Sequence, residues 1–121
     1  MRFSSTQVGP WKPLSLTILF DQGTPVPLRQ HLHGHDITTA FELGWSKMTN
    51  GDLLAQAEAQ GFDALVTTEC NLRYQQNLGS RQIAILVLTT TSWPRIRNTI
   101  PEVAAAVDLL QPGCYSEVLV P

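Results

Sequence analysis

The sequence has few of the features that mark a specialised class of protein. Only two of its 121 residues are cysteines, Cys70 and Cys114, and they form no C-x-x-C pair. This spacing argues against a structural zinc site and favours free, reduced thiols, although two thiols in contact could still form a disulfide. Charged residues make up 15% of the chain, and the formal net charge of −2 gives no bulk electrostatic case for nucleic-acid binding.

Long hydrophobic runs and several catalytic motifs are also missing. No apolar stretch reaches the ~18 residues of a transmembrane helix, and residues 1–13 lack the apolar core of a signal peptide. We therefore expect a cytoplasmic protein that does not associate with membranes. Neither G-x-S-x-G nor G-x-x-x-x-G-K-[ST] occurs, so a serine hydrolase and a P-loop enzyme are not supported.

What remains describes an ordinary globular domain. A hydrophobic content of 43% in 121 residues fits one domain, which at this length buries about two-thirds of its unfolded surface. Residues 1–13 contain two prolines and no periodicity, so we expect a loose N-terminal arm there. Residues 14–121 should form the domain itself.

The apolar run at residues 14–20 organises the domain. It has the length of a strand and stops at Asp21, which Gly23, Thr24 and Pro25 follow closely. A buried parallel strand ends in this way. Because ligands of open α/β sheets bind outside the carboxyl ends of the strands, Asp21 lies where chemistry is usually done.

The rest of the chain alternates between helical and extended patterns. Thr24 and Asn50 have the character of helix N-caps, Gly61 that of a helix end, and Pro101 could begin the regular part of the last helix. Further strands are expected at residues 35–40, 62–68, 83–88 and 115–120, and helices at residues 25–34, 50–60, 71–78 and 96–110. This alternation predicts a three-layer α/β/α sandwich with a mostly parallel central sheet.

Three acids fall where such a sheet would bring them to one edge. Asp21 and Glu69 follow strands, and Asp52 begins a helix. Two unit charges ~4 Å apart repel by about 4 kcal/mol at an effective dielectric of ~20, so a cluster of carboxylates must hold a proton or a cation. Oxygen ligands suit Mg²⁺ or Mn²⁺, which could activate water at a phosphodiester. The alternative is local: Asp21 and Glu69 cap helices, and Asp52 favours its helix dipole.

Other polar residues carry weaker signals. Arg73 and Tyr74 could contact phosphates and stack on bases, as could the arginines after Trp93, although such aromatics are commonly core or rim residues. A histidine chelate would need His31 and His35 on one helix continuing through Gly34, so a solvated helix end is favoured instead.

Several stretches together resemble a known family. They are LFDQG at residues 19–23, GHDI at 34–37, ELGW at 42–45, NGDLL at 50–54 and LVTTECNL at 65–72, the last followed by RYQQNL. In order and spacing they are similar to bacterial PIN-like domains of unknown function, relatives of the VapC toxin ribonucleases. The resemblance covers residues 16–115, and its last stretch is the most specific.

The resemblance implies a five-strand α/β nuclease in which acids bind Mg²⁺ or Mn²⁺ and hydrolyse RNA. It assigns Asp21, Asp52 and Glu69 as catalytic metal ligands, with Asn50 as the alternative for the second position. Together with Arg73 and Tyr74, Asn71 completes the expected substrate-binding set, and Asn71 is also a possible neutral metal ligand. If the chain is a toxin, an antitoxin protein should cover the acidic edge. Glu42 is a further candidate for the acidic site.

The sequence also departs from the family pattern. Relatives commonly have Glu-Asn where this chain has Gln22 and Gly23, Asp where it has Glu69, and a further Asp where it has Asn71. Because Mg²⁺ demands near-ideal octahedral oxygen geometry, this altered acidic set should bind it less tightly. A metal-dependent ribonuclease nevertheless remains the leading hypothesis. The alternative is a catalytically silent module that binds RNA or a protein partner, and in either case packing through Trp45 or Trp93 could form a homodimer.

Overall fold

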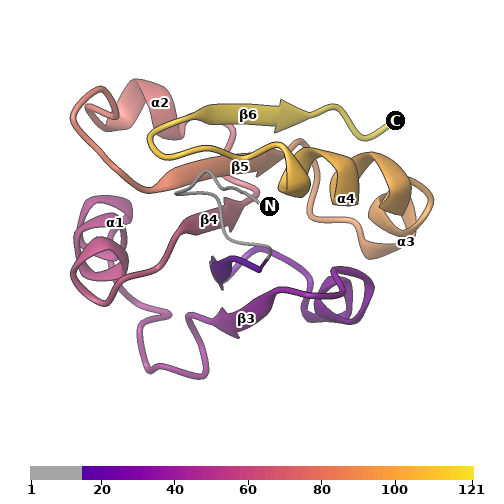
Figure 1. Cartoon of the computed structure of the whole chain (residues 1–121), viewed down its shortest axis with the longest axis horizontal. Helices are drawn as coiled ribbons and strands as arrows, with labels where there is room; N and C mark the ends of the chain where they lie inside the picture. The colour runs from indigo at the N-terminus through magenta and orange to yellow at the C-terminus, as the bar shows by residue number, and fades with distance from the viewer. Residues whose placement is uncertain (1–14) are drawn as a thin grey trace, which may run out of the picture.

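A single five-stranded sheet forms the centre of the computed structural model, which describes residues 15–121 (Figure 1). The strand order is β3-β2-β4-β5-β6, and every neighbouring pair is parallel. The strands are β2 (Thr17–Phe20), β3 (Asp36–Thr39), β4 (Ala64–Thr67), β5 (Ala84–Leu88) and β6 (Tyr115–Val118). The predicted α/β class and parallel sheet are confirmed; the predicted arm at residues 1–13 lies outside the described residues.

Buried side chains cover both faces of the sheet. All residues of β4 and β5 are buried, as expected for parallel strands that are covered on both sides. Successive residues of β2 enter different clusters: Ile18 and Phe20 belong to one, and Leu19 belongs to the other. The alternation follows from the two-residue period of a strand.

Helices pack against each of these faces. They are η1 (Val26–His31, a 3-10 helix), α1 (Asn50–Ala59), α2 (Leu72–Gln75), α3 (Trp93–Arg97) and α4 (Ile100–Asp108). Leu28 of η1, Ile96 of α3 and Val103 of α4 join the first cluster, whereas Leu54 of α1 and Leu72 of α2 join the second. Figure 1 accordingly shows α1 and α2 on one side of the molecule and α3 and α4 on the other.

The helix predicted at residues 25–34 is correct in place but wrong in detail. It is a six-residue 3-10 helix without a side-chain cap, because Thr24 directs its hydroxyl toward Asp21 and Val66 instead. The side chain predicted as an N-cap is therefore part of the sheet edge.

Two further helix predictions need correction. Thr49, not Asn50, caps α1, since its hydroxyl accepts the N–H of Asp52 at 3.2 Å. The helix predicted at residues 96–110 is divided into α3 and α4. Pro101 has no N–H for the carbonyl of Arg97, so one continuous helix would lack a hydrogen bond there.

The connection from β5 to β6 crosses the sheet in an unusual way. It moves in the same direction as the β4–β5 connection, yet α3 and α4 lie on the face that η1 covers, whereas α2 covers the opposite face. Its crossover hand is therefore opposite to that of the other connections. Since about 98% of parallel crossovers are right-handed, this connection is the exceptional part of the fold.

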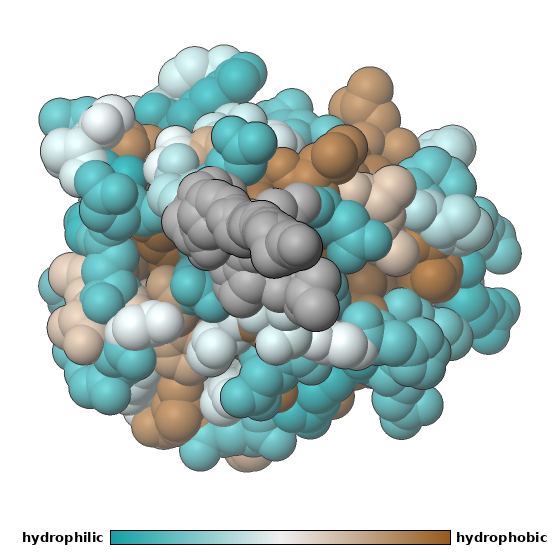
Figure 2. All heavy atoms as spheres, in the orientation of Figure 1, coloured by the Kyte–Doolittle hydropathy of each residue, from teal (hydrophilic) through white to brown (hydrophobic). Residues whose placement is uncertain are grey.

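The surface is mixed in character. Figure 2 shows mostly hydrophilic residues on the face it presents, with hydrophobic ones in small scattered groups. Within residues 15–121, no helix is long and apolar enough to cross a membrane.

Candidate functional site

The carboxyl ends of β2 and β4 define the candidate site. These strands are neighbours, but the chain leaves β2 toward η1 on one face and leaves β4 toward α2 on the other. In open α/β sheets, ligands usually bind at the carboxyl end of the strands, where adjacent connections leave on opposite faces. Asp21 follows β2 and Glu69 follows β4, so the structure brings both predicted acids to this point.

Two threonine hydroxyls hold the carboxylate of Asp21. The Thr24 hydroxyl donates to Oδ1 at 2.7 Å, and the Thr67 hydroxyl donates to Oδ2. Thr24 also lies 3.0 Å from the carbonyl oxygen of Val66, so its single proton has two acceptors within reach. Both threonines are buried, while Asp21 is partly exposed. Buried hydroxyl groups thus hold the Asp21 carboxylate, while the residue stays partly exposed to solvent.

Thr67 connects the two acids. Besides donating to Asp21, its hydroxyl accepts the N–H of Glu69 at 3.0 Å. Glu69 Oε2 in turn accepts the N–H of Asn71 at 3.0 Å, at the start of α2. Glu69 therefore stabilises the turn before α2, but it does not cap that helix, whose N-cap residue is Asn71. Asp21 is not a helix cap, because its acceptors face threonine side chains.

Gly23 allows the two loops to approach closely. A Cβ at this position would lie 2.5 Å from the Thr68 hydroxyl oxygen, closer than real Cβ contacts. The loop after β2 can thus rest against β4 only because residue 23 has no side chain. The glycine at this position therefore has a packing reason.

Asp52 lies in the first turn of α1 and is exposed. Among residues 15–121, no group of three or more His, Cys, Asp or Glu side chains is arranged to hold a metal ion. The structure therefore does not bring Asp21, Asp52 and Glu69 together as a closed ligand set. The oxygen donors still suit a hydrated ion: each Asp21 oxygen accepts one bond and keeps a lone pair, and Mg²⁺ usually binds through one or two carboxylates with several waters.

The start of α1 is attached to α2 by side-chain amides. Asn50 Nδ2 donates to Gln75 Oε1 at 2.9 Å, and Gly51 lies against the amide of Gln76. These contacts and the bonds from Thr24 and Thr67 to Asp21 were not predicted from the sequence. The paired threonines that precede Glu69 were a possible signal, but a β-branched pair in a strand is explained by strand propensity alone.

Arg73 and Tyr74 lie on the exposed side of α2. Tyr74 is 74% exposed. The Arg73 guanidinium lies 4.9 Å from the centroid of the Tyr74 ring and 5.6 Å from that of Tyr115 on β6. Its Nη2 donates to the Tyr74 hydroxyl at 2.9 Å, and the Tyr115 hydroxyl donates to Glu117 Oε2 at 3.1 Å. Burial and the bond to Glu117 raise the pKa of Tyr115 to about 12, so this phenol stays neutral.

The remaining candidates have structural partners. Glu42 accepts from Arg29 Nη1 at 2.9 Å and from the Thr39 N–H at 2.9 Å, and these two bonds lower its pKa. Trp45 and Trp93 are half-buried, the first against Phe62 and the second beside His31.

The three histidines differ in exposure and in hydrogen bonding. His31 and His33 are exposed, but His35 is not part of a solvated helix end: its Nδ1 accepts the Leu16 N–H at 3.0 Å. Cys70 and Cys114 are free thiols, as expected.

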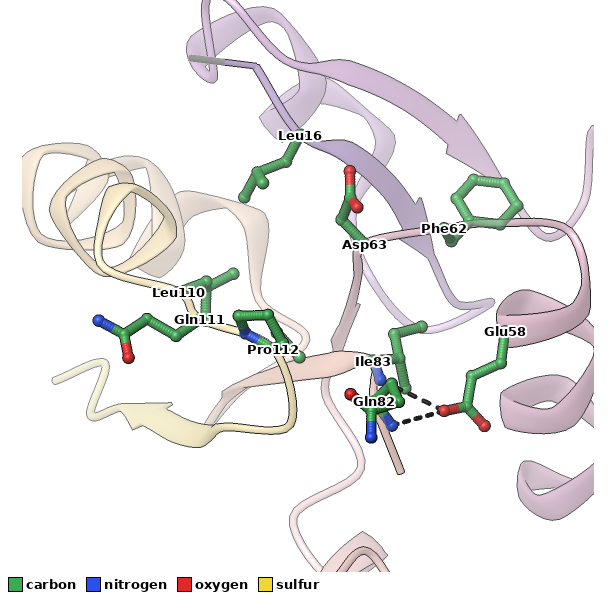
Figure 3. A pocket seen from close by; sticks show the side chains of 10 residues that line it. Leu16, Glu58, Phe62, Asp63, Gln82, Ile83, Leu110, Gln111 and Pro112 are labelled. Carbon is green, nitrogen blue, oxygen red and sulfur yellow. Dashed lines mark hydrogen bonds between the residues drawn. The ribbon is translucent and has the colours of Figure 1, made fainter. Parts of the chain in front are cut away.

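A cavity of about 230 Å³ lies at the opposite edge of the sheet (Figure 3). Its acids serve the backbone: Glu58 accepts the N–H groups of Gln82 and Ile83, and Asp63 accepts that of Thr17. Leu16, Leu110 and Pro112 make much of the remaining wall. It adjoins the amino ends of the strands, away from the edge where parallel sheets bind ligands.

Comparisons with protein-family models, with curated proteins and with solved structures find no match for this chain. The sheet itself gives the fold class, an all-parallel α/β domain, in which Asp21 and Glu69 follow two neighbouring strands.

Proposed function

We propose that this chain is a divalent-metal-dependent ribonuclease that uses Mg²⁺ or Mn²⁺ held by Asp21 and Glu69. The observation that carries the proposal is the Asp21 carboxylate, fixed by Thr24 and Thr67 at the carboxyl end of β2 and next to the end of β4. A carboxylate that is held rigidly yet stays accessible is suited to bind a cation together with a phosphate.

The acids and the two threonines have different roles in this proposal. A bound divalent ion would lower the pKa of its water and neutralise charge on the phosphodiester. Thr24 and Thr67 orient the carboxylate of Asp21, so little rearrangement is needed on binding. Glu69 supplies the second carboxylate through the oxygen that does not hold Asn71. Asp52, from the first turn of α1, contributes negative charge at the same edge.

Calorimetric titration with Mn²⁺ at neutral pH tests the proposal. Wild type should bind one ion, whereas Asp21→Asn, which keeps the shape but removes the charge, should weaken binding at least tenfold. Asp36→Asn is the matched control, because Asp36 is exposed at the other end of the sheet. Cleavage of a mixed RNA pool under the same conditions should be lost in Asp21→Asn alone. Equal Mn²⁺ affinity in wild type and Asp21→Asn would overturn the proposal.

A catalytically silent module is the second candidate. It is favoured by the absence of a three-ligand group within residues 15–121 and by the Glu69 oxygen engaged with its own turn. Such a module would bind RNA at this edge of the sheet without cleaving it. It predicts RNA binding that is independent of Mn²⁺ and unchanged by Asp21→Asn, with no cleavage by either protein.

A further inference from the structure

We infer that Tyr74 and Arg73, supported by Tyr115, form a stacking platform for a base of single-stranded RNA. The platform is defined by these three residues, on α2 and at the start of β6. It rests on the proposed function for the identity of its ligand, and it adds a substrate-binding element to the carboxylate site.

The geometry of Arg73 is the first argument. Its guanidinium lies over two aromatic rings, at 4.9 and 5.6 Å from their centroids, and its hydrogen bond to the Tyr74 hydroxyl fixes its orientation. Among residues 15–121, the ion pairs of arginine involve Arg29 and Arg81 but not Arg73. No carboxylate of the described residues lies within ion-pair distance of Arg73, although the Tyr74 hydroxyl and the nearby charge of Glu117 raise its pKa.

The exposure of Tyr74 is the second argument. An exposed fraction of 74% is high for a tyrosine on a helix whose neighbour Leu72 is buried. Every base has a π-face, so aromatic rings and guanidinium planes bind single strands with little dependence on sequence. A duplex, in which the faces of the bases are already stacked, could not use the platform.

The position of the platform is the third argument. Asn71, which is bonded to Glu69, directly precedes α2, so Arg73 and Tyr74 follow the second acid by four and five residues. The Asn50–Gln75 bond holds α2 against the start of α1. A single strand bound at Glu69 would thus run along α2 toward Tyr74 and the first residue of β6.

Fluorescence anisotropy in EDTA tests the platform without cleavage. The probe is a fluorescein-labelled, unstructured 12-nucleotide RNA. Tyr74→Ala should weaken binding by about tenfold, the loss typical of one stacked base. Tyr74→Phe keeps the ring but loses the hydrogen bond that orients Arg73, so it should weaken binding less than Tyr74→Ala does. Arg73→Lys keeps the charge but loses the plane, so it should weaken binding several-fold.

Phe41→Ala provides the matched control, because Phe41 is also 74% exposed but follows β3. It should bind like wild type, and a duplex of the same sequence should bind all proteins equally weakly. The platform is refuted if Tyr74→Ala binds like wild type, if Phe41→Ala loses as much affinity, or if wild type binds no RNA. Thermal melting confirms that each variant is folded.

The same variants separate this inference from the proposed function. If Tyr74→Ala binds RNA weakly in EDTA while no protein cleaves RNA with Mn²⁺, the platform stands and the nuclease proposal fails. If wild type cleaves RNA and Tyr74→Ala changes neither binding nor KM, the nuclease proposal stands and the platform fails.

Discussion

Thr67 donates a hydrogen bond to Asp21 Oδ2 across the boundary between two parallel strands. Phe20 pairs with Val66, so the next residues on each strand are opposite one another as the sheet ends. Thr67 is only 1% exposed. The bond therefore joins the accessible acid to the buried core.

Thr67→Val should separate the structural role of this hydroxyl from that of the side-chain shape. The substitution keeps the volume but leaves Asp21 and the Glu69 N–H each without one partner, which should cost about 1–3 kcal/mol in the free energy of unfolding. Urea denaturation at pH 7 measures the loss. Thr67→Ser keeps the hydroxyl and removes one methyl, and should lose less. Equal losses in the two variants would show that packing, not the hydrogen bond, matters here.

Gly23→Ala should disturb the contact between the two loops. The added Cβ meets the Thr68 hydroxyl at 2.5 Å, so the side chain or the loop must move. We expect a loss of about 1 kcal/mol in stability, as for mild overpacking. Thr68→Ala removes the opposing oxygen and should restore most of the loss in the double variant. Gly79→Ala, where the nearest atom is 3.4 Å away, is the control and should stay near wild type. A double variant no more stable than the additive sum would contradict this account.

The position of Asp21 could be predicted, because ligand-binding acids commonly follow the carboxyl ends of parallel strands. Its hydrogen-bond partners, Thr24 and Thr67, could not be predicted. The apolar run before Asp21 fixes a strand, and the order of the sheet then decides which strand end lies beside it. Only the pairing of β2 with β4 makes Thr67 the neighbour of Asp21, and that pairing joins residues 46 positions apart. A threonine in a strand is explained equally well by propensity, so its sequence carries no sign of the bond.

Two other features depend on packing that local sequence does not encode. The exceptional hand of the β5–β6 connection depends on which face of the sheet α3 and α4 cover. Both faces are apolar, so the local sequence does not decide between them. His35 has polar neighbours in sequence, yet its side chain is only 7% exposed, beside Asp108 of α4. Such burial is decided by the distant helix, not by the local pattern.

Glu58 should make stability depend on pH in the acid range. Burial alone would raise the pKa of Glu58. Hydrogen bonds from Arg81 and from the N–H groups of Gln82 and Ile83 together lower it by more than burial raises it, so the net pKa is below the ordinary value of 4.5. A lowered pKa in the folded state stabilises the fold above the unfolded-state pKa, and the contribution disappears as the pH falls through the folded-state value.

Glu58→Gln therefore should lose about 1–3 kcal/mol of stability at pH 7, because it weakens charge-assisted bonds. The difference from wild type should shrink as the pH is lowered below 4.5, the ordinary pKa of this carboxyl. Urea denaturation at a series of pH values from 7 to below 4 measures both effects. Glu102→Gln, at an exposed position in α4, is the control and should show no comparable trend. A difference that stayed constant with pH would contradict the assignment.

His35 should be a structural tether at the start of the sheet. Its Nδ1 accepts the Leu16 N–H at 3.0 Å, so Nδ1 must be the unprotonated nitrogen, and Nε2 lies 3.3 Å from Asp108 Oδ1. Long-range ¹⁵N–¹H NMR should therefore show the tautomer protonated at Nε2. His35→Ala leaves the Leu16 N–H without this acceptor and should cost about 1–3 kcal/mol of stability. His33→Ala, which removes an exposed imidazole, should stay within about 0.5 kcal/mol of wild type. A tautomer protonated at Nδ1 would contradict the tether, because two N–H groups would then face each other.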